Sequence, residues 1–169
     1  FLLKEATKAL AHREDLQATF MAKPFAREEG SGFHLHISLW RGDDNAFLQA
    51  DGSLSETCLA FIAGVMDHAP ALTAFASPTV NSYKRLQPDG IVATAAGWSH
   101  DNRLAYVRVP PERGDSTRVE ARGADASANP YLLTAVTLLA GLDGIERDLR
   151  PTETPKRLPR TLDEALDEL

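Results

Sequence analysis

The stretch GSGFHLHISLW, residues 30–40, decides how the rest of the sequence is interpreted. A glycine-rich turn leads into residues that alternate between apolar and polar, and successive side chains of a β-strand point to opposite faces of the sheet. The apolar face carries Phe33, Leu35, Ile37 and Leu39. The polar face carries His34, His36 and Ser38. Because side chains two residues apart on a strand are about 6.5 Å apart, one imidazole could hold a metal ion while the next contacts a phosphate oxygen bound to it. A half-exposed strand with two solvated histidines is the plainer alternative.

The composition is typical of a globular protein with a single domain. The 169 residues are 43% hydrophobic and 25% charged, with a mean hydropathy of -0.25. No apolar run approaches the roughly 20 residues that span a bilayer, and the first residues lack the pattern of a signal peptide. We therefore expect a cytoplasmic protein without a membrane partner. Cys58 is the single cysteine, which excludes an intrachain disulfide and a thiolate metal cluster, and we expect it in the core.

The charge of the chain is unevenly distributed. A net charge of -6 argues against a general nucleic-acid binder. Residues 81–122 nevertheless carry seven basic residues against five acidic ones, a local balance of +2 that leaves -8 for the remainder. Six arginines lie within the 38 residues from Arg85 to Arg122. Since the guanidinium group matches phosphate and carboxylate oxygens, this cluster indicates an anion site.

Hydrophobic periodicity and turn residues predict the order of the elements. Helices are expected at 2–14, 54–68, 70–75 and 131–147, the last of these largely buried, with a further helix from Leu162. Strands are expected at 19–22, 33–40, 104–109 and 117–122. Residues 41–52 predict a hairpin or lid, 81–90 a loop that presents Arg85, and 150–160 an extended segment. The pairs Ser53/Glu56 and Thr161/Glu164 have the spacing of capping boxes.

The strand predicted at 117–122 has a polar face of its own. Arg118, Glu120 and Arg122 alternate with apolar residues, which makes this strand the natural partner of the histidine strand. A carboxylate between two arginines is usually a structural ion pair, but it is also a hard oxygen ligand for Mg²⁺. Beside His34, Glu120 could share a metal ion with the imidazole.

Three stretches together resemble the catalytic domain of glutamine synthetase. They are residues 30–40, NSYKRL at 81–86 with DNR at 101–103 and Arg108, and RVEAR at 118–122 continuing through Asp125 to Ile145. The motifs keep the family's order and nearly its spacing, and cover most of residues 15–147. The resemblance implies an α+β fold with a curved antiparallel sheet and helices packed on one side, similar to the guanidino kinases. It also implies that residues 1–169 are part of a catalytic domain truncated at both ends.

The resemblance further implies an ATP-dependent carboxylate-amine ligase that forms γ-glutamyl phosphate, which ammonia or another amine then attacks. His34 and Glu120 would be ligands of Mg²⁺ or Mn²⁺. His36, Ser38, Arg108 and Arg118 would bind ATP. Gly30, Arg85 and Arg122 would bind glutamate, and Arg103 and Arg85 would act in catalysis. The full-length protein would be a homo-oligomer, and the fragment alone, with two of three ligands for one metal ion, is expected to be inactive.

Three positions depart from the family pattern. Glu29 stands where asparagine is typical, Ile91 where a flap glutamate helps to deprotonate ammonium, and Asp115 where lysine is often close to ATP. The departure at Ile91 favours an amine larger than ammonia, as in ligases that γ-glutamylate polyamines. A catalytically silent homologue that senses glutamate or nucleotide, or acts as a scaffold, is a second hypothesis. A phosphagen-type kinase is a remote third, because fold analogy alone is weak.

Overall fold

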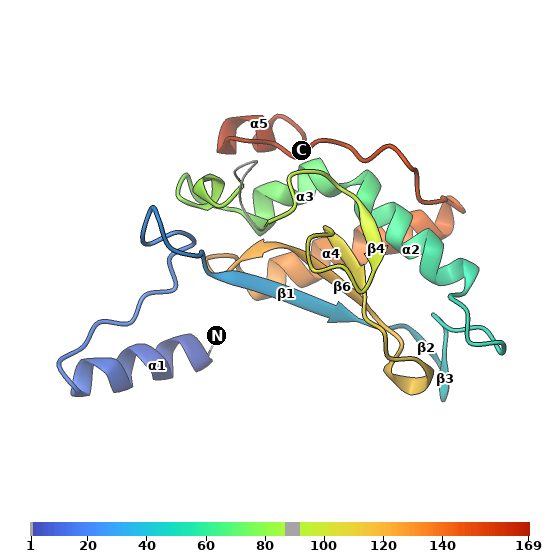
Figure 1. Cartoon of the computed structure of the whole chain (residues 1–169), viewed down its shortest axis with the longest axis horizontal. Coiled ribbons are helices and arrows are strands. Elements are labelled where there is room, and N and C mark those ends of the chain that lie inside the picture. Colours follow the sequence, from blue (N-terminus) through green and yellow to red (C-terminus); the bar gives the residue numbers. More distant parts are fainter. Residues whose placement is uncertain (1, 87–91) are drawn as a thin grey trace.

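A four-stranded sheet with helices on one face forms the body of the computed structural model, which describes residues 2–86 and 92–169 (Figure 1). The helices are α1 (Leu2–Arg13), α2 (Glu56–Asp67), α3 (Ala69–Ala76), α4 (Pro130–Glu146) and α5 (Leu162–Leu166). The strands are β1 (Gly32–Ile37), β2 (Trp40–Arg41), β3 (Asp44–Asn45), β4 (Trp98–His100), β5 (Val107–Val109) and β6 (Val119–Asp125). Two 3-10 turns are η1 (Ser82–Lys84) and η2 (Gly114–Ser116). The α+β class expected from the sequence is confirmed.

The sheet is mixed, and the expectation of a purely antiparallel sheet is wrong. Its order is β1-β6-β5-β4, with β6 antiparallel to both β1 and β5, whereas β4 is parallel to β5. The strand predicted at 104–109 begins only at Val107, because residues 101–106 form the turn that brings the chain back beside β4. Strand β4 has three residues, too few for a period of two to be recognised.

The pairing of β1 with β6 includes an irregularity next to His34. Phe33 lies opposite Ala124, while Leu35 lies opposite Ala121, so β6 has an extra residue at this point. Such a bulge bends the strand and redirects its side chains. Gly123 is required here because a Cβ at that position would lie 2.2 Å from the Tyr106 ring.

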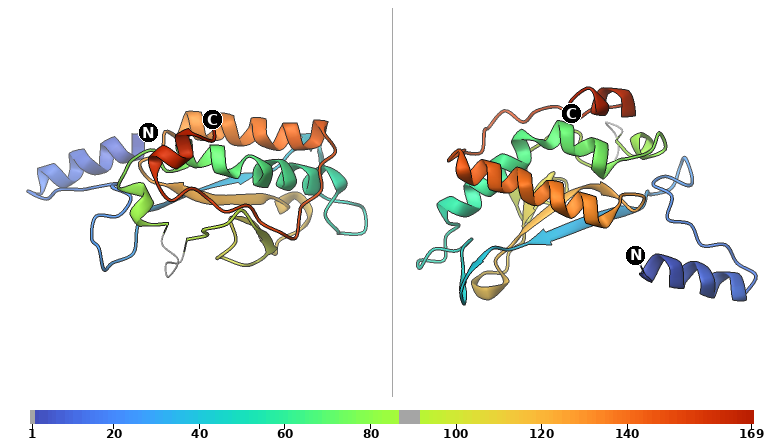
Figure 2. Two further views of the ribbon diagram at one scale, coloured as in Figure 1. Left: turned by 90° about the horizontal axis from the view of Figure 1, so that it is seen from above. Right: turned by 180° about the vertical axis from the view of Figure 1, so that it is seen from behind.

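The core lies between the apolar face of the sheet and the helices (Figure 2). Phe61, Ile62 and Val65 of α2 are fully buried together with Val107 and Val119 of the sheet. Burial of this apolar surface is the main favourable contribution to folding. The helical layer therefore supports the sheet from behind and leaves its other face open to ligands.

The predictions of a buried Cys58 and of a helix cap at Thr161 are confirmed, whereas those of a cap at Ser53 and of a strand at 19–22 are wrong. Cys58 is buried, as predicted, and Thr161 caps α5 by accepting a hydrogen bond from the Glu164 N–H at 3.1 Å. Helix α2 is capped by Ser55, whose Oγ accepts from the Cys58 N–H at 3.0 Å, so the prediction of a cap at Ser53 is wrong. The strand predicted at 19–22 is also wrong, since these residues are irregular.

Helices α1 and α4 expose apolar side chains that hydrophobic periodicity predicts to be packed against the body. Helix α1 has no buried residue, and it stands apart from the body in the right-hand view of Figure 2. Helix α4 is only half-buried, and not largely buried as predicted, since it exposes Tyr131, Leu132, Leu139 and Leu142. Among the described residues no single helix has the length and hydropathy to cross a membrane, although α2 and α3, bent by 71°, pass that test as a pair.

Candidate active site

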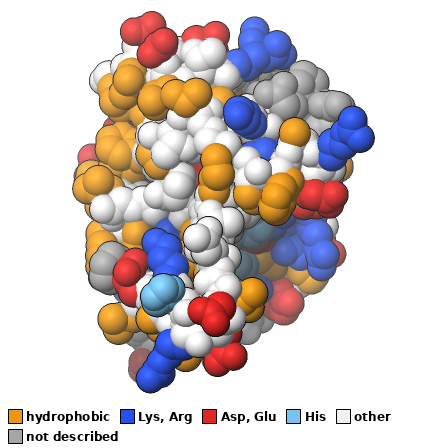
Figure 3. Space-filling model, turned by 90° about the vertical axis from the view of Figure 1, so that its left-hand side faces the viewer, with side chains coloured by type: hydrophobic (Ala, Val, Ile, Leu, Met, Phe, Trp, Pro, Cys, Tyr) orange, Lys and Arg blue, Asp and Glu red, His pale blue; other side chains and the backbone are white. Residues whose placement is uncertain are grey.

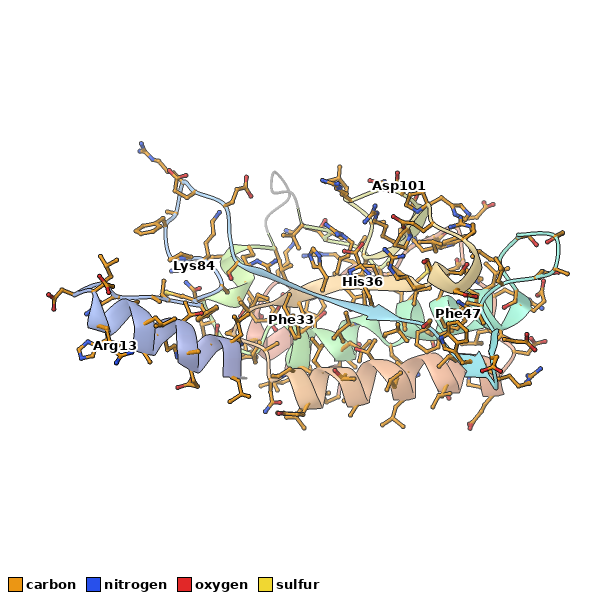
Figure 4. The ribbon with its side chains drawn as sticks, turned by 90° about the horizontal axis from the view of Figure 1, so that it is seen from below. Arg13, Phe33, His36, Phe47, Lys84 and Asp101 are labelled. Carbon is orange, nitrogen blue, oxygen red and sulfur yellow. The ribbon has the colours of Figure 1, made fainter. Side chains whose placement is uncertain are left out.

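The polar faces of β1 and β6 meet on the side of the sheet opposite the helices. Figure 4 shows Phe33 directed toward the helices and His36 directed away from them. His34 Nδ1 lies 2.9 Å from Glu120 Oε1, and His36 Nε2 lies 3.7 Å from the same oxygen. The prediction that the histidine strand pairs with the strand bearing Glu120 is confirmed.

Glu120 is almost completely buried, and two arginines stabilise its charge. Arg108 Nη1 donates to Oε2 at 3.0 Å, and Arg122 Nη1 donates to Oε1 at 2.6 Å. Burial alone would raise the pKa of Glu120, but the hydrogen bond from Arg108 and the charge of Arg122 outweigh it and lower the pKa. The carboxylate is therefore ionised at neutral pH.

His34 is held in its neutral form by its surroundings. Burial and the positive charge of Arg122 lower the pKa of His34, against an opposing effect of Glu120. A neutral imidazole retains a free lone pair on one ring nitrogen. His34 and Glu120 therefore present the two donor types, imidazole nitrogen and carboxylate oxygen, that a metal ion requires in deprotonated form.

A cleft of about 250 Å³ opens next to this pair. Its described lining consists of Lys23, Glu29, Gly30, Gly32, His34, Arg85, Val92, Ala93, Arg103, Ala105 and Arg122. On the face drawn in Figure 3, histidine atoms lie inside a hollow whose rim carries basic and acidic side chains. The cleft thus gathers every residue that the resemblance assigned to glutamate binding and catalysis, together with the proposed metal ligand His34.

Arg85 is the most unusual residue of the cleft. It is 6% exposed, yet its Nε and Nη1 atoms have no hydrogen-bond partner among the described residues. Its nearest counter-charge is Asp125 Oδ2, 3.9 Å from Nη1. Burial lowers the pKa of Arg85 and Asp125 opposes this effect, but the guanidinium remains charged. A buried donor without an acceptor is costly, and the positive charge of Arg85 in the wall of the cleft favours an anionic ligand there.

Arg85 is positioned by the chain before it. It directly follows η1, and so it belongs to a packed turn and not to the open loop that the sequence predicted. Asn81 anchors this turn, because its Oδ1 accepts from the Lys23 N–H at 2.7 Å and its Nδ2 donates to the Lys23 carbonyl at 3.0 Å. The two sides of the cleft are thereby joined through residues 58 positions apart.

The residues predicted to bind ATP lie outside the cleft lining. Arg118 Nε donates to His36 Nδ1 at 3.1 Å, and Ser38 Oγ accepts from the Trp40 indole N–H at 3.0 Å. Arg108 bridges Glu120 and Asp101. These polar groups lie on the same face of the sheet as the cleft. The His34–Glu120 pair therefore lies between the cleft on one side and these groups on the other. Such an arrangement suits two anionic ligands that meet at one metal ion.

Comparison with protein families identifies the chain. The family model described as "Glutamine synthetase, catalytic domain" matches residues 1–169. The chain belongs to the glutamine synthetase family.

Curated relatives named glutamine synthetase agree with this membership. The protein of Pyrococcus abyssi is 46% identical over 98% of this chain, and that of Thermus thermophilus is 43% identical over 98%. The protein of Halobacterium salinarum is 48% identical over 88% of this chain. The chain spans only 42% of the length of the first two relatives and 33% of the third.

The donor set for a metal ion is incomplete in this part of the glutamine synthetase family fold. The described residues contain no group of three or more His, Cys, Asp or Glu side chains that could hold a metal ion. His34 and Glu120 fit such an ion chemically, as one nitrogen and one hard oxygen donor. They supply only part of the coordination that Mg²⁺ or Mn²⁺ needs, and both oxygens of Glu120 already accept from arginines.

Sequence reasoning missed two residues of the site, Lys23 and Asp125. Lys23 enters the cleft only because Asn81 holds its backbone, and Asp125 lies behind Arg85 at the end of β6. Neither belongs to an alternating pattern, so no local signal separated them from solvated charges. Ile91, the position of the expected flap glutamate, lies outside the described residues.

Proposed function

We propose that this chain is part of an ATP-dependent ligase that forms glutamine, or a related γ-glutamyl amide, from glutamate and an amine. The observation that carries the proposal is the convergence of three guanidinium groups, those of Arg85, Arg103 and Arg122, on one cleft. Three guanidinium groups around one small cleft favour a ligand with two carboxylates. The names of the relatives add that such proteins are glutamine synthetases.

The reaction that we propose has two steps. A γ-carboxylate oxygen of glutamate attacks the γ-phosphorus of ATP, the bond to the β–γ bridging oxygen breaks, and ADP leaves. The amine nitrogen then attacks the acyl carbon of γ-glutamyl phosphate, phosphate leaves, and the nitrogen loses a proton. Both steps bring negatively charged groups together, so fixed positive charges lower the barrier.

We assign a role to each residue of the cleft according to its position. Arg85 and Arg122 would hold the carboxylates of glutamate, and the main chain at Gly30 would receive its amino group. Arg103, exposed at the cleft, would neutralise the phosphoryl group as it moves. Binding that is stronger in the transition state than in the ground state accelerates the chemical step, and Arg103 is free to provide it.

The polar area beyond the His34–Glu120 pair would take the nucleotide. His36, Ser38, Arg108 and Arg118 offer nitrogen and hydroxyl groups to phosphate oxygens. His34 and Glu120 would hold Mg²⁺ or Mn²⁺, which supplies charge neutralisation between the two anions. Because these two donors alone bind a metal ion weakly, we expect the 169-residue chain to turn over nothing measurable by itself.

The alternative is a homologue that binds glutamate or nucleotide without turnover. It is favoured by one observation, the absence of a three-donor metal group among the described residues. We also propose that the full-length protein is a homo-oligomer, since α1 and α4 expose leucines that another subunit could cover.

The decisive experiment measures phosphate release by the full-length protein. ATP, Mg²⁺ or Mn²⁺ and glutamate are supplied with amines from ammonia to long diamines. We expect release that depends on both glutamate and an amine, and loss of release by about 10²- to 10³-fold in Arg103→Ala. Near-normal rates in Arg103→Ala contradict its role, and glutamate binding without any release supports the silent homologue. Phosphate release by the 169-residue chain alone would contradict the expected weakness of its metal site.

A further inference from the structure

Glu29 differs in charge from the other ionised side chains around the cleft. The described lining contains four basic side chains, Lys23, Arg85, Arg103 and Arg122, and Glu29 is its one carboxylate. Within the described part of the chain, Glu29 is exposed and its carboxylate forms no hydrogen bond or ion pair. Glu29 thus lines a mainly basic cleft without a structural ion pair of its own among the described residues.

The backbone next to Glu29 is held against the wall of the cleft. The Ser31 N–H donates to the Ala22 carbonyl at 2.8 Å, which closes the loop on which Glu29 lies. A Cβ at Gly30 would lie 2.7 Å from the Ala22 carbonyl oxygen and 2.8 Å from Arg85 Cγ. The turn at Glu29 is therefore packed directly against the side chain of Arg85.

We propose that Glu29 is a specificity-determining residue that pairs with the ammonium group of an α-amino dicarboxylate bound in the cleft. This inference rests on the proposed function and adds a charge requirement to it. The guanidinium groups would take the two carboxylates, and Glu29 would take the one positive charge. A dicarboxylate without an ammonium group would leave Glu29 unpaired and repel it, so the cleft would discriminate against such a ligand.

Equilibrium binding to the full 169-residue chain tests this inference. Glutamate and glutarate differ only in the ammonium group, and their affinities are measured for the native chain, Glu29→Gln and the matched control Glu28→Gln. Glu28 is the exposed neighbour and does not line the cleft. We expect Glu29→Gln to weaken glutamate binding about tenfold, as for a lost hydrogen bond between charged groups, and to leave glutarate binding equal or stronger. Glu28→Gln should change neither affinity.

The outcomes separate this inference from the proposed function. If glutamate binds the native chain and Glu29→Gln leaves its affinity unchanged, or weakens both ligands equally, the role of Glu29 is wrong while the glutamate site stands. If neither ligand binds the native chain at millimolar concentration, the proposed glutamate site fails and the role of Glu29 fails with it. Circular dichroism of each variant establishes that the comparison is between folded proteins.

Discussion

Glu120 joins the polar side chains of three strands. It accepts from Arg108 on β5 and Arg122 on β6, and its Oε1 lies 2.9 Å from His34 Nδ1 on β1. Each of these contacts satisfies a group that is partly withdrawn from water. The residue is consequently important for stability as well as for any ligand that the site holds.

Replacing Glu120 by glutamine should destabilise the chain. The variant keeps the shape of the side chain but loses its charge, so Arg122, 17% exposed, loses its counter-charge, and Arg108, 15% exposed, keeps only Asp101. We expect a decrease of about 2–3 kcal/mol in the free energy of unfolding, measured by urea denaturation. Glu112→Gln is the control, because Glu112 is 55% exposed and pairs only at the surface with Arg118. Equal effects of the two variants would contradict the importance of Glu120.

Single residues of the site were predictable only where a pattern linked them. The alternation in 33–40 and 117–122 predicts His34 and Glu120 on neighbouring strands. The burial of Arg85 depends on the clamp between Asn81 and Lys23, and such a contact between irregular segments has no periodicity in the sequence. The alternating pattern therefore predicts the two paired strands, but it does not predict the part of the cleft that Lys23 and Arg85 form.

Helices α2 and α4 approach each other closely at two glycines. A Cβ at Gly64 would lie 2.2 Å from the Ala140 carbonyl oxygen, and a Cβ at Gly144 would lie 2.3 Å from the Ala60 carbonyl oxygen. Glycine at these two positions lets the helix backbones touch. The helical layer is thin for this reason, and both helices reach the sheet side of the core.

Gly64→Ala should force α2 and α4 apart. Alanine has the higher helix propensity, by about 1 kcal/mol, but the clash is with backbone and cannot be relieved by a rotamer change. We expect a net loss of about 2 kcal/mol in the free energy of unfolding, measured by urea denaturation. Gly97→Ala is the control, since a Cβ there meets only Pro155 Cβ at 3.8 Å. A Gly64→Ala variant as stable as Gly97→Ala would exclude this account of the packing.

Elements were predictable in proportion to their length and periodicity. The 12 residues of α2 and the six of β1 carry clear patterns, and both elements are found, although β1 ends at Ile37, three residues before its predicted end. The three residues of β4 carry none, so the parallel pair β4–β5 was missed. Tertiary pairing, and not local propensity, makes this segment a strand.

At the scale of the whole molecule, α1 is almost independent of the body. It lies beside the body at the N-terminal end of the chain (Figure 1), has no buried residue, and exposes its leucines at positions 2, 3 and 10. Lys4 links it to later parts of the chain, through a hydrogen bond from Nζ to the Ala126 carbonyl and the position of Nζ 5.9 Å from the centre of the Phe20 ring. The stability of the body should therefore depend little on this helix.

Removing residues 1–13 tests that independence. Exposed contacts of one lysine contribute little, so we expect the free energy of unfolding to change by less than about 1 kcal/mol. The affinity for glutamate should also be unchanged, because none of the described residues lining the cleft comes from α1. Urea denaturation and equilibrium binding measure the two quantities on the same sample. A loss of several kcal/mol would mean that the exposed leucines of α1 are covered in solution, and concentration-dependent sedimentation would then distinguish packing within one chain from packing between two copies.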